Sequence, residues 1–446
     1  MQIKKGYYLV GGAVRDKILG LKPKDKDYLA VGYSEEEMLR NGFLCVGKHF
    51  PVFLHPHTKE EYALPRRERS TGKKYTDFVC ETENVSVEED LKRRDLTINS
   101  ILEISEGLFF DPFNGKEDIE NKILRHTSGA FIEDPLRVLR VARFRARYPD
   151  FNIAEETCEL IKSMRDMLSS LSKERIFSEL KKALSEESPH MFFITLRELG
   201  VLDIIFPDLF SWTNVYHENK YHMEGSIFNH AMLVLSEASK ISKSKRVRFG
   251  ALFHDIGKAT SYNISGNFHM HYNRDLVNDL VIKLKDNYCL PNKYVKVVKT
   301  AALFHHKIYK VEEMKASSIV RMFTDKDFPQ TEEELEKLLD ISIADSFGRI
   351  IHISGPRKVL NIYKSLYALK KEIYSEGEYN KSVYKPGNTE RKDFVNAKLI
   401  KEIFHKIKKV NVRDFTKKEY SGEKIKQELH KRRIAAVLNL KNSYKE

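Results

Sequence analysis

Two aspartates one residue apart, Asp25 and Asp27, lead into the apolar run DYLAV. Residues i and i+2 of a strand point to the same face, so two carboxylates spaced in this way project together and repel each other. A divalent cation removes that repulsion, and Mg²⁺ commonly binds through one or two carboxylates together with substrate phosphates. Glu61, at the start of EYALP, is the third carboxylate that we predict from a neighbouring strand. We therefore predict a catalytic magnesium site for phosphoryl transfer at Asp25, Asp27 and Glu61. The simpler alternative is a solvated acidic loop.

A candidate phosphate-binding turn precedes these carboxylates. The apolar run YYLV ends in Gly11 and Gly12, and a helical pattern begins at Ala13. Glycines at a strand end let the backbone approach a ligand closely, and the first N–H groups of a helix attract phosphate. Arg15, in the first helical turn, would add a guanidinium that pairs with phosphate oxygens. Together these residues predict a site for a nucleoside triphosphate.

A row of basic side chains follows in the segment EDPLRVLRVARFRARY. On a helix, Asp134 and Arg137 share a face at a spacing of i and i+3, and Arg140 and Arg143 extend the same row. The alternative is an amphipathic helix whose arginines simply face water. That alternative does not explain why this row lacks acidic partners one turn away.

Histidines and aspartates gather in the second half of the chain, in the segments FNHAML, LFHDIGK, FHMHYNRD, LFHHK and SIADSFGR. Imidazole and carboxylate ligands together suit a transition metal such as Ni, Mn or Zn better than Mg. Such a metal can activate water for phosphoester hydrolysis. The alternative is a set of ordinary buried histidines. The predicted metal ligands are His230, His254, Asp255 and Asp345, with His271 and His305 as further candidates.

The elements that position these residues change along the chain. Short strand-like runs (YYLVGG, KDYLAVG, PVFLHP, EYALP) alternate with the helical runs AVRDKILG and SEEEMLRNG up to about residue 125. From about Ile132 nearly every segment has helical periodicity. We therefore predict an α+β protein with a small mixed sheet in its head, followed by helical domains. The predicted ranges are 1–125, 126–215, 216–350 and 351–446.

Composition limits the classes of partner. The 446 residues carry a net charge of +13, and residues 391–446 hold 17 Lys and Arg against 7 Asp and Glu. This basic tail favours a polyanionic partner such as a nucleic acid. The four cysteines are widely spaced, no apolar run approaches the roughly 18 residues of a membrane span, and the first residues lack a signal-peptide pattern. We expect a cytoplasmic protein without membrane contact.

Several motifs in order resemble one enzyme family: LVGGAVRD with KDKDY, then EEDLKRRDLTINS, DPFNG, EDPLRVLRVARF and ERIFSEL. These segments look like those of the bacterial class II CCA-adding enzymes, within the tRNA nucleotidyltransferase and poly(A) polymerase family, that carry an HD domain. The resemblance covers the whole chain except a weaker stretch around residues 354–410. It implies that residues 1–125 are a nucleotidyltransferase head, 126–215 a helical neck, 216–350 an HD domain and 351–446 a basic body and tail.

The resemblance also implies roles for single residues. Asp134 and Arg137 would read the incoming base with Arg140 and Arg143 near the nucleotide. Cytosine and adenine each present an amine donor beside a ring-nitrogen acceptor, which suits a carboxylate next to a guanidinium; uracil and guanine do not. In EEDLKRRDLTINS, Arg94 would contact the nucleotide and Asp95 its ribose, whereas Thr97 and Asn99 would form structural hydrogen bonds. Apart from the resemblance, Glu174 and Arg175 stand at the start of a helix in ERIFSEL, and we expect them to brace that helix and not to take part in catalysis.

The implied activity is addition of C, C and A to tRNA 3′ ends from CTP and ATP, with Mg²⁺. The HD domain implies a second activity as a phosphatase or 2′,3′-cyclic phosphodiesterase, with Ni²⁺, Mn²⁺ or another transition metal. Two alternatives stay open: a poly(A) polymerase with the same head, and an HD-centred phosphohydrolase or tRNA-binding protein with an inert head. The partners expected are tRNA and the two nucleotides, and the chain is expected to be a monomer or a homodimer.

Overall fold

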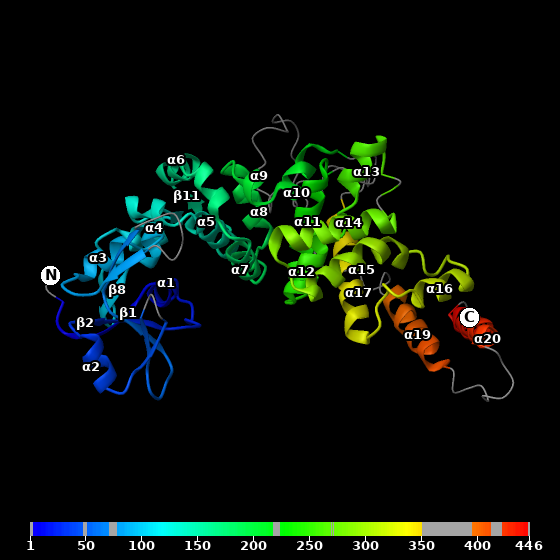
Figure 1. The fold of residues 1–446 in the computed structure, drawn as a ribbon, viewed down its shortest axis with the longest axis horizontal. Coiled ribbons are helices and arrows are strands. Elements are labelled where there is room, and N and C mark those ends of the chain that lie inside the picture. Colours follow the sequence, from blue (N-terminus) through cyan, green and yellow to red (C-terminus); the bar gives the residue numbers. More distant parts are fainter. Residues whose placement is uncertain are drawn as a thin grey trace, which may run out of the picture. The chain divides into compact units, whose positions relative to one another are not determined.

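The protein divides into two compact units, which we describe separately (Figure 1). The computed structural model describes residues 3–47, 51–70, 78–216, 224–268, 270, 272–349, 395–411 and 422–444. Unit 1 comprises residues 1–179 and 186–206, and unit 2 comprises residues 180–185 and 207–446.

Unit 1 begins with a mixed sheet whose described strands run in the order β3-β4-β5-β2-β1-β8-β9. Its strands are β1 (Gly6–Val10), β2 (Asp27–Val31), β3 (Leu44–Val46), β4 (Val52–Leu54), β5 (Glu61–Ala63), β8 (Leu102–Ser105) and β9 (Leu108–Phe110). Strand β1 pairs antiparallel with β2 and β8, while β2 pairs parallel with β5. A separate hairpin joins β6 (Arg67–Ser70) to β7 (Phe78–Glu81).

Helices cover both faces of this sheet, because side chains of each strand alternate between the faces. On one face Ala30, Phe53 and Tyr62 pack against Met38 of α2 (Glu35–Arg40). On the other face Val10, Leu29 and Leu102 pack against Val87 and Leu91 of α3 (Val87–Lys92). Asp27 lies two residues before Leu29, so it belongs to the face that α3 covers.

Capping residues in the sequence set where both of these helices begin. Ser34 and Glu37 form a reciprocal capping box at the start of α2, and Ser86 and Glu89 form another at the start of α3. Each box satisfies N–H groups that the first helical turn leaves without partners. The remaining elements of this part of unit 1 are α1 (Gly12–Ile18), η1 (Thr97–Asn99), α4 (Gly115–Glu120) and β10 (Ile123–Leu124).

The rest of unit 1 is mainly helical. Its elements are η2 (Gly129–Glu133), α5 (Leu136–Arg147), β11 (Asn152–Ile153), α6 (Glu155–Ser163), η3 (Arg165–Ser170), α7 (Lys173–Ala183, of which residues up to Glu179 belong to unit 1), α8 (His190–Glu198) and α9 (Leu202–Ile205). The sequence predicts a purely helical region here, but β11 pairs parallel with β10. After α5 ends the chain is extended, so the Asn152 and Ala154 N–H groups donate to the Lys122 and Leu124 carbonyls.

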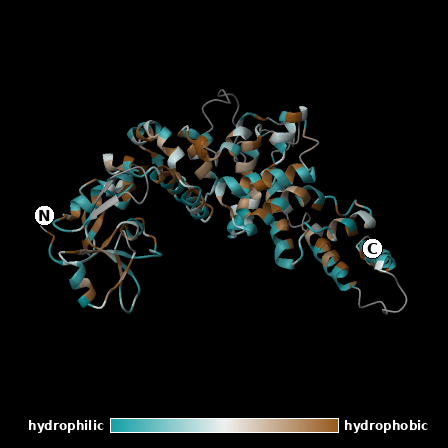
Figure 2. Ribbon diagram, in the orientation of Figure 1, coloured by the Kyte–Doolittle hydropathy of each residue, from teal (hydrophilic) through white to brown (hydrophobic). Residues whose placement is uncertain are grey.

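Unit 2 is helical in its described residues. Its elements are α10 (Pro207–Ser211), η4 (Trp212–Asn214), α11 (Ile227–Ile241), α12 (Lys245–Leu252), α13 (Lys258–Ser265), α14 (Arg274–Tyr288), α15 (Asn292–Ile308), α16 (Ala316–Phe323), α17 (Glu332–Gly348), α19 (Val395–Lys409) and α20 (Gly422–Ser443). Its core joins α11, α12, α15 and α17 through Val234, Ala251, Ala301 and Ile341. Figure 2 shows hydrophobic and hydrophilic residues alternating along these helices, as expected for amphipathic helices with one buried face.

The predicted fold class is confirmed, because a mixed-sheet head precedes helical domains. The predicted strands at YYLV, DYLAV, VFL and EYA correspond to β1, β2, β4 and β5. In the described part of the chain, no helix combines the length and the apolar character that crossing a bilayer requires. The cytoplasmic location stays a prediction.

Candidate active sites

The predicted metal carboxylates lie on neighbouring strands of the head. Asp27 opens β2 and is directly opposite Glu61, the first residue of the parallel strand β5. Asp25 lies in the bend before β2, so the prediction that both aspartates belong to the strand is wrong in detail. All three side chains are exposed, and none forms a hydrogen bond or ion pair with another described residue. Their oxygens do not all approach within 4.8 Å of one another, so a shared cation requires rotation of these side chains.

Neighbouring charges shift the pKa of Asp27 in opposite directions. Although Asp27 is exposed, partial desolvation by the surrounding protein raises its pKa, the charge of Arg94 opposes that shift, and the charge of Asp25 adds to it. Arg94 therefore lies close enough to act on the carboxylates, and the two aspartates repel each other. A bound cation would favour the ionised form of both aspartates.

The turn at Gly11 leaves space for Arg94 beside the predicted metal carboxylates. Gly11 caps α1 with φ 71° and ψ −129°, a conformation that other residues rarely adopt. A Cβ atom on Gly11 would lie 2.7 Å from Arg94 Nη1. Arg94 Nε and Nη2 donate to Asp90 Oδ2 at 3.3 and 3.1 Å, and Asp90 is fully buried. Gly11 thus leaves room for a guanidinium that Asp90 holds beside the carboxylates.

Arg15 has a different environment from the one that the sequence predicts. It is 3% exposed, and its guanidinium donates to Asp16 Oδ1 and to Asn99 Oδ1 while lying over the rings of Phe144 and Tyr148. In this structure Arg15 therefore joins α1 to α5. Arg15 could make its predicted phosphate contact only if these hydrogen bonds broke. Its guanidinium also lies close to Gly12, one turn earlier in the chain.

The predicted base-reading pair lies at the start of α5. Helix α5 begins at Leu136, after Pro135, so Asp134 precedes the helix and does not share its face with Arg137 as predicted. The Leu136 N–H donates to Asp134 Oδ1 at 3.1 Å, and Arg175 Nη2 donates to both Asp134 oxygens at 2.9 Å. Arg137 is 9% exposed and its Nη1 donates to the Ala130 carbonyl at 2.7 Å.

The other arginines of α5 pair with acids from distant segments. Arg140 Nε and Nη2 donate to Asp95 Oδ2 at 2.8 and 2.7 Å, and Arg143 Nε donates to Glu179 Oε2 at 2.8 Å. Although burial opposes it, the Arg140 charge and the Asn99 amide hold the pKa of Asp95 well below its usual range. Both Asp95 oxygens are engaged and the residue is 5% exposed, so its ribose contact stays a prediction. The arginine row therefore has its acidic partners outside its own helix.

The predicted structural roles of Thr97 and Asn99 fit the geometry. Thr97 Oγ1 donates to Asp118 Oδ2 at 2.6 Å, and Asn99 Nδ2 donates to Asp95 Oδ1 at 3.0 Å. Both residues are buried. They hold the segment between α3 and β8 that carries Asp95.

Unit 2 brings the predicted metal ligands together in its core. His230, His254 and Asp345 place one ligand atom each within 4.8 Å of one another, and so do His254, Asp255 and His305. All five residues are at most 2% exposed. His271 lies outside the described residues. The structure thus assigns His305, a secondary candidate from the sequence, to the same cluster as the other four.

Contacts at Nδ1 orient the three imidazoles, through hydrogen bonds for His254 and His305 and through an ion-pair contact for His230. The Nδ1 atoms of His254 and His305 donate to the Ala251 and Ala301 carbonyls at 2.7 Å, and His230 Nδ1 lies 2.9 Å from Glu224 Oε1. The Nε2 atoms therefore face the carboxylates: His230 Nε2 lies 3.2 Å from Asp345 Oδ1, and His254 Nε2 3.1 Å from Asp255 Oδ2. An acceptor on Nδ1 leaves Nε2 as the metal-binding atom.

The buried charges of this cluster also suit a metal ion. Both carboxylate oxygens of Asp255 are buried, and burying a carboxylate is costly unless a cation lies beside it. Lys258 Nζ lies 2.7 Å from Asp255 Oδ2, and Arg349 pairs with Asp345. Burial lowers the pKa of His305 to about 4, so this imidazole is neutral and able to act as a ligand.

Sequence reasoning missed several residues that position these groups, namely Asp90, Glu224, Lys258 and Arg349. Three of them have a recognisable spacing. Lys258 follows Asp255 at i+3, and Arg349, the residue after the end of α17, follows Asp345 at i+4. Asp90 precedes Arg94 at i−4 on the end of α3. Glu224 has no such local signal.

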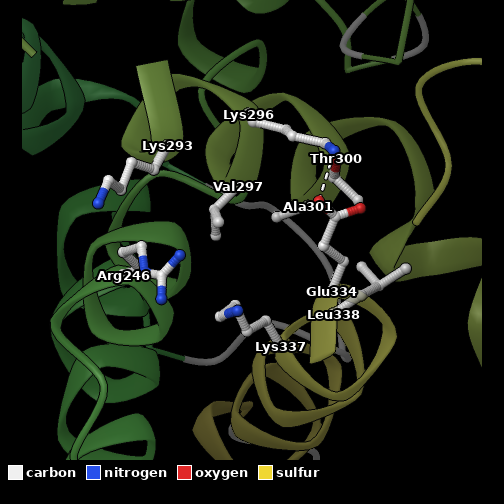
Figure 3. Close-up of a pocket in the computed structure, with 9 residues that line it drawn as sticks. All are labelled: Arg246, Lys293, Lys296, Val297, Thr300, Ala301, Glu334, Lys337 and Leu338. Atoms are coloured by element: carbon white, nitrogen blue, oxygen red, sulfur yellow. Dashed lines mark hydrogen bonds and ion pairs between the residues drawn. The ribbon is translucent and has the colours of Figure 1, made fainter. Parts of the chain in front are cut away.

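A pocket elsewhere in unit 2 belongs to neither centre. It has a volume of about 70 Å³ and lies between α12, α15 and α17 (Figure 3). Its cations include Arg246, Lys296 and Lys337, which pair with Glu333 or Glu334. Because no predicted site residue lines it and its charges are largely balanced within the protein, we assign it no role.

Comparisons with known proteins agree with this arrangement. Residues 7–125 match the poly A polymerase head domain, residues 150–213 a probable RNA- and SrmB-binding site of polymerase A, and residues 227–350 the HD domain. The multifunctional CCA protein of Shewanella denitrificans is 39% identical over 98% of both chains. That of Mannheimia succiniciproducens is 42% identical over 77% of this chain and 84% of its own. The structure of the Bacillus stearothermophilus CCA-adding enzyme in complex with CTP has a TM-score of 0.53 at 22% identity, covering 81% of this chain and 78% of its own, and it shares the fold. The predicted resemblance is confirmed, and the chain belongs to the family of multifunctional CCA proteins.

Proposed function

We propose that the head adds C, C and A to tRNA 3′ ends from CTP and ATP. The observation that carries this proposal is the alignment of Asp27 with Glu61 on neighbouring strands, with Arg94 held beside the turn at Gly11. Helix α5, which carries Arg137, is joined to the segment after Arg94 through the ion pair between Arg140 and Asp95. Relatives over the full length of the chain are multifunctional CCA proteins, and solved CCA-adding enzymes of the same fold bind CTP or ATP. Nucleotidyltransferase and HD domains are both metal-dependent.

The head's own residues would bind and orient the substrates. The 3′-hydroxyl of tRNA attacks the α-phosphorus of the nucleotide, a new phosphodiester bond forms, and pyrophosphate leaves. Asp25 and Asp27, with Glu61, would hold Mg²⁺, which stabilises the attacking and leaving oxygens when bound. Arg94 lies where its charge acts on Asp27, so it is placed to contact the triphosphate of the same site.

Base choice would rest on Asp134 and Arg137. An ionised carboxylate only accepts hydrogen bonds and a guanidinium only donates them. Together they match the amine and ring nitrogen of cytosine or adenine, and they leave polar groups unmatched opposite uracil or guanine. Arg137 must exchange its bond to the Ala130 carbonyl for one to the base.

The basic tail is the proposed tRNA-binding region. Helix α20 carries cations on several sides, and most of its described residues are exposed. Such a surface would hold RNA through phosphates and shape more than through base sequence. The choice between a monomer and a homodimer stays a prediction.

The buried cluster in unit 2 supports a second, hydrolytic activity. Three imidazoles with inward Nε2 atoms and two carboxylates suit Ni²⁺, Mn²⁺ or another transition metal. When bound, such an ion activates water for attack on phosphorus. The proposed substrates are phosphomonoesters and 2′,3′-cyclic phosphodiesters.

The proposal for the head is tested with tRNA that lacks its 3′ end, CTP, ATP and Mg²⁺. Sequencing of the product should show CCA. A run of A from ATP alone would favour the poly(A) polymerase alternative, and no addition by a folded protein would favour the inert head.

A further inference from the structure

Arg175 makes a contact that the sequence does not predict. The sequence assigns it to a brace within its own helix, but its Nη2 reaches outside α7 and lies 2.9 Å from both carboxylate oxygens of Asp134. The two side chains are each 23% exposed. This ion pair is thus shielded from most solvent, where a charged hydrogen bond is stronger than at the surface.

Asp134 depends on such a partner for its orientation. It precedes α5 in extended backbone, with φ −127° and ψ 102°, and the helix holds only its Oδ1, through the Leu136 N–H. The terminal torsion of an aspartate is broad and roughly two-fold. The described donors to its carboxylate are the Leu136 N–H and Arg175 Nη2, and Oδ2 receives only the second of these. Oδ2 therefore keeps a lone pair for a further donor.

A fixed acceptor is what base selection requires. If the carboxylate rotates, its oxygens no longer meet the amine of cytosine or adenine in line, and the penalty against the carbonyl of uracil falls as well. The effect of Arg175 is separable from simple helix packing, because Arg143 and Glu179 join α5 to α7 at another point.

We propose that Arg175 is a positioning residue for base selection, which holds Asp134 so that the site favours cytosine and adenine over uracil and guanine. This inference rests on the proposed function of the head. It assigns Arg175 no contact with the nucleotide. Its signature is a change in the ratio of correct to incorrect nucleotides, and not only a loss of rate.

The test compares R175Q with wild type in single-nucleotide addition of CTP and UTP to truncated tRNA. The ratio of kcat/KM for CTP to that for UTP should fall by about 10- to 100-fold, the range for losing one charged hydrogen bond. R175K, which keeps a charge, should recover part of the ratio. E179Q, which breaks the other link between the two helices, and R165Q, which breaks a comparable pair with Asp203, should leave the ratio near that of wild type.

A double mutant makes the test independent of folding. D134N alone should lower the ratio, and R175Q in the D134N background should lower it no further, since Arg175 acts only through that carboxylate. An unchanged ratio in R175Q, an equal loss for both nucleotides, or the same additional loss in the D134N background would each overturn the inference. If wild type itself adds neither C nor A, the proposed function has failed and not this inference alone.

Discussion

Replacing Gly11 by alanine tests how the turn before α1 serves the head. At φ 71° and ψ −129°, a residue with a Cβ atom costs about 1–3 kcal/mol in backbone strain. The melting temperature of the head should fall by about 2–4 °C for each kcal/mol. In addition, the new Cβ would lie 2.7 Å from Arg94 Nη1, closer than nonbonded atoms approach, so the guanidinium must move.

A movement of Arg94 would disturb its hydrogen bonds to Asp90. Asp90 is fully buried and holds Arg94 through Nε and Nη2, and it also binds Arg93 Nη2 at 2.7 Å. Displacing Arg94 therefore weakens a buried ion pair and shifts a cation next to Asp27. Because displacements on the order of 1 Å in an active site can cost about 100-fold in rate, we expect kcat/KM for CTP to fall about 10- to 100-fold.

Gly20 provides the matched control. Its φ is also positive, at 69°, but a Cβ atom there meets nothing within 4 Å. G20A should lose stability through the backbone alone and keep kcat/KM for CTP within about twofold of wild type below its melting temperature. Thermal unfolding and steady-state CTP addition are measured on both variants. Equal losses of activity in G11A and G20A, or full activity in a folded G11A, would refute the role that we give to the approach of Arg94.

Two further predictions concern unit 2. His254→Ala should abolish metal-dependent phosphohydrolase activity and leave CCA addition within about twofold of wild type, because the two centres lie in separate units; a parallel loss of both activities in a folded variant would contradict separate sites. Burial raises the pKa of Asp340 to about 6, with Glu336 adding to the shift while Ser242 and Lys401 oppose it. A raised carboxyl pKa means that the folded protein binds the proton more tightly, so stability is lost as pH rises from about 4 through 6. Asp340→Asn should therefore raise the melting temperature relative to wild type at pH 8, and by only about half as much at pH 5, in the middle of the titration range. An equal effect at both pH values would show that Asp340 does not titrate in this range.

The positions of Asp27 and Glu61 in the sheet could be predicted because their signal is local, whereas their role as metal ligands stays a prediction. The strand that starts at Asp27 and the glycines before α1 are visible in the sequence, and the parallel pairing of β2 with β5 then aligns Asp27 with Glu61. The sequence pattern predicts that Asp25 belongs to this strand, but β2 begins only at Asp27. The histidine cluster was predicted from order and residue type, but only packing shows that His305 faces it.

The roles of the arginines could not be predicted, because their partners lie far away in the chain. Arg15 is 84 residues from Asn99, and Arg143 is 36 residues from Glu179. Local spacing suggested that Arg15 faces phosphate and that the row on α5 lacks acids. Tertiary contacts bury Arg15 between α1 and aromatic rings at α5. They also bring acidic partners from other elements to the arginines of α5.

The central claim is that the carboxylates at Asp25 and Asp27 support addition of nucleotides by the head. The most direct measurement is the 3′ sequence of truncated tRNA after incubation with CTP, ATP and Mg²⁺, for wild type, D27N and the control D150N, which alters an exposed surface pair with Lys122. The account predicts a CCA end with wild type and D150N, and no added nucleotide with D27N although tRNA still binds. A CCA end formed by D27N at the wild-type rate would contradict it.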